Sequence, residues 1–81
     1  MIEVIMYTKN ECPNCARAEM LFNFCPVEIS VEKRNIEDPK EGAKHLAEIK
    51  GKDIMSVPSF VIDGQWIEGF NEGKVKGALG L

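Results

Sequence analysis

Short apolar runs alternate along the chain with longer segments in which apolar residues recur at helical spacing. Residues 1–7 are continuously apolar from Val4 onward, which is typical of a central strand covered on both faces. Residues 27–36 begin with apolar side chains at every second position, which predicts a strand with one solvent-exposed face at the edge of a sheet. Residues 60–62 and 65–67 predict two more strands, and Asp63-Gly64 between them predicts a hairpin turn.

A first helix is predicted over residues 16–24. Its apolar residues Ala16, Met20 and Phe24 lie four positions apart. Leu21 and Phe22 flank them, and we expect all five side chains to pack in the core. Pro26 ends this helix, because the residue before a proline is disfavoured in the helical conformation. Cys25 is therefore expected at the helix end as a buried or half-buried small apolar side chain.

The second predicted helix has Asp38 as its N-cap, Pro39 in its first position and Gly51 at its end. We expect an inner face of Ala43, Leu46, Ala47 and Ile49 and a solvated outer face of Lys40, Lys44, Glu48 and Lys50. His45 lies beside the apolar stripe. A lone histidine on a helix is more often structural or exposed than catalytic, so no catalytic role is predicted for it.

A third, short helix follows Asn71 as its N-cap and is expected to pack through Val75, Ala78 and Leu79. The complete order is β-α-β-α-β-β-α. This alternation predicts an α/β fold, and the length of 81 residues predicts a single domain over residues 1–81.

Composition narrows the range of partners. The net charge is −3 and the basic residues form no cluster, which argues against nucleic acid or an anionic membrane as the main partner. No apolar run approaches the roughly 20 residues that span a bilayer. Three cysteines, an odd number, do not suggest a secreted disulfide framework. We therefore expect a monomer in a reducing, cytoplasmic setting.

Cys12-Pro13-Asn14-Cys15 stands where the first strand gives way to the first helix. A Cys-x-x-Cys pair in a βαβ context is typical of thioredoxin-like redox proteins. Pro13 suits the first helical position, which makes Cys12 the N-cap, beside the unpaired N–H groups and the positive end of the helix dipole. Both features favour the thiolate, so Cys12 is predicted to attack and Cys15, one turn deeper, to resolve.

A structural zinc site is the alternative use of two neighbouring cysteines. Such a site needs two more ligands, and the candidates are Cys25 and His45. Cys25 lies about 15 Å further along the same helix, so it cannot reach Cys15 unless the helix breaks. The spacing favours redox chemistry, and a zinc-binding or redox-sensing module without turnover is kept as the rival hypothesis.

The cysteine pair, the Val57-Pro58 step before a strand, and Gly69-Phe70 before the last helix together resemble the glutaredoxin branch of the thioredoxin superfamily. The resemblance covers essentially the whole chain. It implies a four-stranded mixed sheet with three helices, in which the first two strands are parallel and the last two antiparallel. It also implies a cis Val57–Pro58 bond facing the cysteines.

By the same resemblance the chain is a small dithiol oxidoreductase with no bound cofactor. A glutathione or substrate site is implied at Lys9, Pro13, Asn14, Val57, Pro58, Gly69, Phe70, Asn71 and Glu72. Trp66 and Gly69-Phe70 are similar to NrdH-type redoxins, which are recharged by thioredoxin reductase and supply ribonucleotide reductase. Glutathione and a flavoprotein reductase therefore stand as alternative electron sources. Trp66 is expected either to pack partly in the core or to line an apolar docking patch with Phe70.

Overall fold

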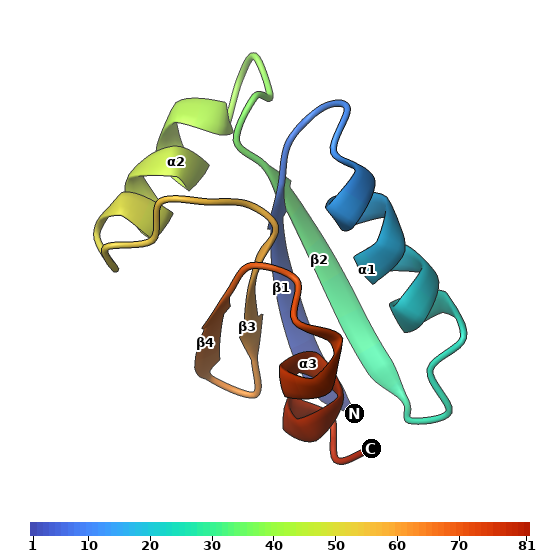
Figure 1. Cartoon of the computed structure of the whole chain (residues 1–81). Coiled ribbons are helices and arrows are strands. Elements are labelled where there is room, and N and C mark those ends of the chain that lie inside the picture. The colour runs from blue at the N-terminus through green and yellow to red at the C-terminus, as the bar shows by residue number, and fades with distance from the viewer.

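The computed structural model describes residues 1–81 and has the predicted order β-α-β-α-β-β-α (Figure 1). Its elements are β1 (Ile2–Thr8), α1 (Pro13–Asn23), β2 (Ile29–Asn35), α2 (Gly42–Lys50), β3 (Ser59–Ile62), β4 (Gln65–Glu68) and α3 (Glu72–Ala78). Asp63 and Gly64 form the hairpin between β3 and β4, and both have positive φ angles, 50° and 83°. Asp-Gly suits such a turn because glycine adopts a positive φ without steric penalty.

The four strands form one mixed sheet in the order β2-β1-β3-β4. β1 pairs with β2 in parallel and with β3 antiparallel, and β3 pairs with β4 antiparallel. The apolar strand β1 is therefore central, and β2 lies at an edge, both as predicted. The fold is the thioredoxin-like, glutaredoxin-type architecture that the resemblance implied.

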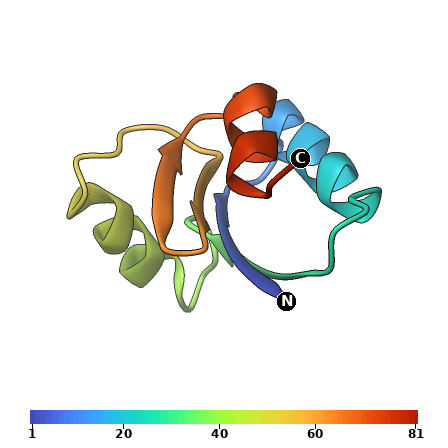
Figure 2. The same cartoon turned by 90° about the horizontal axis from the view of Figure 1, so that it is seen from below.

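Helices α1 and α3 cover one face of the sheet and α2 covers the other (Figures 1 and 2). The main core lies on the α1 and α3 side. It consists of nine buried residues: Val4, Met6, Ala18, Phe22, Phe60, Ile62, Ile67, Val75 and Leu79. The Phe22 ring meets the fully buried Phe60 ring edge-on at 5.8 Å between centroids, a favoured aromatic geometry.

A smaller cluster of Tyr7, Ile49 and Ile54 lies on the α2 side. Trp66 is half-buried there and stacks on Tyr7 with 5.7 Å between ring centroids. Core packing, one of the two expected roles of Trp66, is thus what the structure shows. The other expectation, that Trp66 and Phe70 line one patch, is wrong, because Phe70 packs against the cluster on the opposite face of the sheet.

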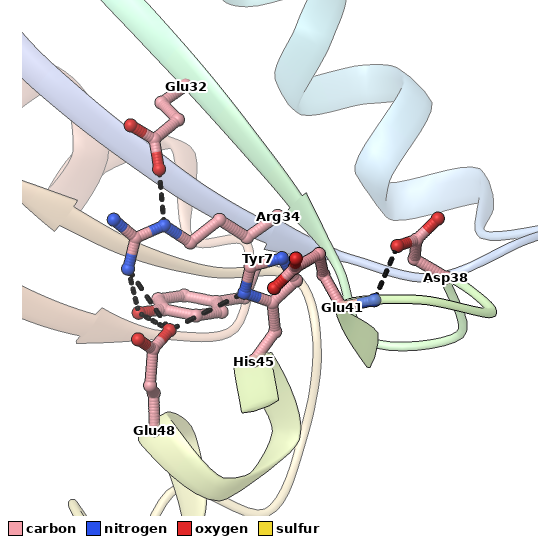
Figure 3. A network of polar contacts seen from close by, with 7 residues as sticks. All are labelled: Tyr7, Glu32, Arg34, Asp38, Glu41, His45 and Glu48. Carbon is pink, nitrogen blue, oxygen red and sulfur yellow. Dashed lines mark hydrogen bonds and ion pairs between the residues drawn. The ribbon is translucent and has the colours of Figure 1, made fainter. Parts of the chain in front are cut away.

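A polar network also holds α2 to the sheet (Figure 3). The Tyr7 hydroxyl donates to Glu48 Oε1 at 3.1 Å and accepts from Arg34 Nη1 at 3.1 Å. Arg34 Nη1 also donates to Glu48 Oε1 at 3.0 Å, and its Nε donates to Glu32. His45 Nδ1 is buried without a hydrogen bond, 3.6 Å from Glu48 Oε1. Glu48, expected on a solvated face, is instead half-buried at the centre of this network.

The pKa values of Glu48 and Tyr7 are shifted in the directions that preserve this network. Burial raises the pKa of Glu48, but the hydrogen bond from Tyr7 and the charge of Arg34 outweigh burial and hold the pKa below its ordinary value. Burial is the largest cause of a raised pKa for Tyr7, and its hydrogen bond to Glu48 adds to the effect. Glu48 is thus kept ionised and Tyr7 protonated over a wide pH range.

The core packing predicted for α1 is confirmed for Phe22, which is buried, and for Leu21, which packs against the core, but it is wrong for the other three residues. Met20 and Phe24 are 61% and 81% exposed, and Ala16 is exposed as well. The buried residues of this helix are Cys15, Ala18 and Phe22. Successive helical residues are rotated by about 100°, so a stripe that begins at residue 16 points well away from one that begins at residue 15. Cys25, expected to be buried or half-buried, is half-buried and packs beside the core.

Helix α2 begins three residues later than predicted. The Asp38 carboxylate accepts from the Glu41 N–H at 2.7 Å, but it caps a turn rather than the helix itself. Gly42 then passes so close to the preceding chain that a Cβ would lie 2.5 Å from the Ile36 carbonyl oxygen. Ala43 and Ala47, predicted to face inward, are exposed, whereas Leu46 is half-buried and Ile49 is buried.

Candidate redox site

The candidate site residues gather at one end of the sheet, where β1 ends and β3 begins (Figure 1). Tyr7 near the end of β1 pairs with Ser59, and Ser59 pairs with Glu68 at the end of β4. The three segments that adjoin these residues therefore leave the sheet at the same end of the strands. One carries Cys12, one carries Val57-Pro58, and one carries Gly69-Phe70.

Cys12 and Cys15 form a disulfide at the start of α1, with their Cα atoms 5.2 Å apart. Cys12 is the N-cap, as predicted, and its backbone is extended, with φ −114° and ψ 103°. Its Sγ accepts a hydrogen bond from the Cys15 N–H at 3.2 Å, one of the otherwise unpaired donors of the first turn. Cys12 is half-exposed, whereas Cys15 is only 3% exposed. An incoming disulfide can thus reach Cys12 far more readily than Cys15.

A set of polar contacts that sequence analysis missed holds the loop before Cys12. The Asn10 N–H donates to Glu37 Oε1 at 2.7 Å, and Asn35 Nδ2 donates to Asn10 Oδ1 at 2.9 Å. These bonds tie the loop to the turn that follows β2. Glu11 has a positive φ of 52°, which is uncommon for a non-glycine residue and turns the chain into the N-cap. No local motif pairs Asn10 with residues about 25 positions away.

The Val57–Pro58 peptide bond is cis, as the resemblance implied. Pro58 is buried and Val57 half-buried. Neither the N–H nor the C=O of Val57 is hydrogen-bonded within the chain. Both groups are therefore available to an extended segment that lies alongside them, in the manner of an added β-strand.

Lys9 lies beside this backbone. It lines a hollow of about 280 Å³ together with Lys50, Met55 and Val57. Neither lysine forms an ion pair, so the hollow has two uncompensated positive charges. Pro13 occupies the first position of α1, and the exposed Asn14 follows it on the surface of the first turn.

Gly69 to Glu72 form the third part of the site region. Gly69 has a φ of 77°, a conformation that favours glycine. Phe70 is half-buried and packs against Phe60, with 6.4 Å between ring centroids. Asn71 Oδ1 accepts from the Lys74 N–H at 3.0 Å as the N-cap of α3, and Glu72 forms an ion pair with Lys76. The Asn71 side-chain oxygen is therefore engaged by the helix.

An apolar groove of about 670 Å³ runs from Phe70 between α1 and α3. It is lined by exposed Met20 and Phe24 and by the free, half-buried Cys25. Cys25 is near the far end of α1 from Cys12, as the sequence indicated. No group of three or more His, Cys, Asp or Glu side chains is placed to hold a metal ion. The structure therefore offers no set of ligands for the zinc site of the rival hypothesis.

No helix of this structure combines the length and the apolar character needed to cross a bilayer.

The sequence matches the family model described as Glutaredoxin over residues 4–67. Glutaredoxin 1 from Francisella tularensis, solved in complex with cacodylate, is 29% identical with a TM-score of 0.70, over 95% of this chain and 93% of that one. A dithiolic glutaredoxin from Trypanosoma brucei brucei is 30% identical with a TM-score of 0.68, over 94% and 84%. A glutaredoxin from Archaeoglobus fulgidus is 30% identical, also at 0.68, over 96% and 86%. None of the curated proteins compared with the chain matches it significantly.

Proposed function

We propose, because this chain belongs to the glutaredoxin family and holds Cys12 and Cys15 at disulfide distance, that it reduces protein or mixed disulfides by dithiol exchange. Family membership and the cysteine pair indicate thiol–disulfide redox chemistry in general. The assignment of separate roles to the two cysteines is our proposal.

The reaction begins from the reduced protein. The Cys12 thiolate attacks one sulfur of the partner disulfide, and the other partner sulfur leaves as a thiolate that takes up a proton. Cys15 then loses its proton and attacks Cys12 Sγ. This step forms the Cys12–Cys15 disulfide and releases the second partner thiol. Two electrons pass from the protein to the partner, and one of the two protons comes from Cys15 and the other from solvent, so no bound cofactor is required.

The position of Cys12 is the observation that carries this proposal. Cys12 is half-exposed at the N-terminus of α1, and its sulfur accepts a hydrogen bond from a backbone N–H there, while Cys15 is buried one turn on. Hydrogen bonding and the helix dipole both favour a thiolate at this position. The accessible sulfur is thus also the one whose ionised form the fold stabilises.

The electron source has two candidates. Glutaredoxins in general use glutathione, and Lys9, Val57, Asn71 and Glu72 stand where the family resemblance puts its contacts. A thioredoxin reductase is the source that the similarity to NrdH-type redoxins suggests, with ribonucleotide reductase as the electron acceptor. We propose glutathione as the primary reductant because family membership supports it directly.

Separate coupling to each reductant tests the proposal. Purified protein is supplied with glutathione, glutathione reductase and NADPH, or with thioredoxin reductase and NADPH, and reduction of insulin disulfides is followed in each case. Turnover with glutathione is the expected result. Turnover with thioredoxin reductase alone would instead favour the NrdH-type assignment. Absence of reduction in both systems, with zinc in the purified protein, would support the interaction-module hypothesis.

A further inference from the structure

We propose that Glu68 is a positioning residue for disulfide exchange. Its carboxylate holds residues 55–58 in the conformation that presents the Val57 backbone to a peptide substrate. The inference rests on the proposed function for its consequence in catalysis. The contact itself is independent of that function.

Two hydrogen bonds from this segment converge on one oxygen of Glu68. The Met55 N–H donates to Glu68 Oε2 at 3.0 Å, and the Ser56 hydroxyl donates to the same atom at 3.1 Å. Hydrogen bonds to a carboxylate are roughly twice as strong as bonds between neutral groups. Glu68 is the last residue of β4, so the strand gives the carboxylate a fixed point of attachment.

Burial holds the end of the segment, at Val57 and Pro58, but its first half has little else to hold it. Residues 55–58 take part in no backbone–backbone hydrogen bond, although they join a helix to a strand. Met55 is 85% exposed and is not anchored by burial. The one further polar tether is the Ser59 hydroxyl, which donates to the Ser56 carbonyl oxygen at 2.5 Å. Glu68 therefore supplies two of the three hydrogen bonds that fix this segment.

The held segment is the one that a peptide substrate would use. The unpaired N–H and C=O of Val57 follow directly after the two residues that Glu68 holds. A peptide that carries a disulfide can pair its own backbone with these groups while its sulfur meets Cys12. A small disulfide without a peptide backbone cannot form these hydrogen bonds with Val57. Loss of the Glu68 carboxylate should therefore slow the reaction with peptides and spare the reaction with small disulfides.

The experiment follows a single oxidation of fully reduced protein by two probes. One is bis(2-hydroxyethyl) disulfide, and the other is a short peptide with one intramolecular disulfide. The variants are Glu68→Ala, Glu68→Gln, which retains an acceptor oxygen, and Gln65→Ala, an exposed residue of the same strand, as the matched control. Amide hydrogen exchange at Met55 supplies a readout that does not depend on activity.

For Glu68→Ala we expect the second-order rate constant with the peptide to fall about tenfold, while the rate constant with the small disulfide stays within about twofold. Exchange at the Met55 amide should accelerate about tenfold. Glu68→Gln should restore both values to within about threefold of the wild type. Gln65→Ala should leave all of these quantities unchanged.

Unchanged peptide reactivity in Glu68→Ala, or an equal loss with both disulfides, would overturn the positioning role. Unchanged exchange at Met55 would overturn the tether itself. If the wild-type protein reacts with neither disulfide, the proposed function fails. Exchange at Met55 then still decides whether Glu68 holds the segment.

Discussion

The two faces of the sheet are stabilised in different ways. The face under α1 and α3 is a continuous apolar core centred on Met6 and Phe60, both 0% exposed. The face under α2 has a smaller apolar cluster, and the charged Tyr7–Arg34–Glu48 network spans from the sheet to the helix. The cysteine pair begins the helix that packs on the apolar face. Apolar packing thus supports the helix that carries the proposed chemistry, while the polar face mainly attaches α2 to the sheet.

Because the two faces differ in this way, we expect the largest loss of stability from a substitution in the apolar core under α1 and α3. Phe60→Ala removes a fully buried ring that contacts both Phe22 and Phe70, and it should lower the free energy of unfolding by about 3–5 kcal/mol. Urea denaturation measures this value. A loss below about 1 kcal/mol would mean that the two faces do not differ as described.

A smaller loss is expected on the polar face. Arg34→Met leaves Glu48 and Glu32 without their cationic partner and should cost about 1–3 kcal/mol of unfolding free energy. Lys33→Met is the matched control, because Lys33 forms a mostly exposed ion pair with Glu19 that contributes at most about 1 kcal/mol. Equal losses in the two variants would show that the Arg34 network is no more than a surface ion pair.

The network also predicts that stability depends on pH. The expected change is smaller than the loss from either Phe60→Ala or Arg34→Met. Because the folded-state pKa of Glu48 is lowered, its stabilising effect is present above the ordinary value of 4.5 and is lost as the pH falls through the folded-state pKa. Glu48 is partly exposed, so screening limits the effect to less than about 1 kcal/mol. The difference in unfolding free energy between the wild type and Glu48→Gln should therefore shrink below that pH. A constant difference would contradict the proposed linkage.

The smallest effect should come from the apolar side chains outside both clusters. Met20→Ser and Phe24→Ser alter exposed positions of α1 and should change the unfolding free energy by no more than about 0.5 kcal/mol each. Phe22→Ser, on the buried face of the same helix, is the positive control. A large loss of unfolding free energy in Met20→Ser or Phe24→Ser would instead support the core packing that the four-residue spacing predicted.

Local sequence patterns predicted those parts of the fold that depend on neighbouring residues. The apolar run after Val4 indicated the central strand, and Cys12 followed by Pro13 indicated where α1 begins. The cis Val57–Pro58 bond came from family resemblance rather than from spacing. Conversely, the buried face of α1 could not be chosen from periodicity, because Ala16, Met20 and Phe24 form a stripe as regular as that of Cys15, Ala18 and Phe22.

The features that local patterns did not predict depend on contacts between segments that are distant in the sequence. Glu48 looked like one member of a charged helical surface, and only the fold places it against Tyr7, 41 positions earlier. Gly42 delays the start of α2 because of its close approach to Ile36, which no capping motif records. Similarly, Asn10 and Glu68 hold the loops of the candidate site through partners that the sequence does not identify.

Trapping the mixed disulfide tests most directly whether Cys12 attacks and Cys15 resolves. A peptide disulfide is added to Cys15→Ser and to Cys12→Ser, both in a Cys25→Ser background so that one reactive sulfur remains, and adducts are measured by mass spectrometry. Cys15→Ser should accumulate a stable adduct on Cys12, and Cys12→Ser should form almost none, because Cys15 is buried. Rapid adduct formation on Cys15, or full disulfide reduction by Cys12→Ser, would contradict the assigned roles.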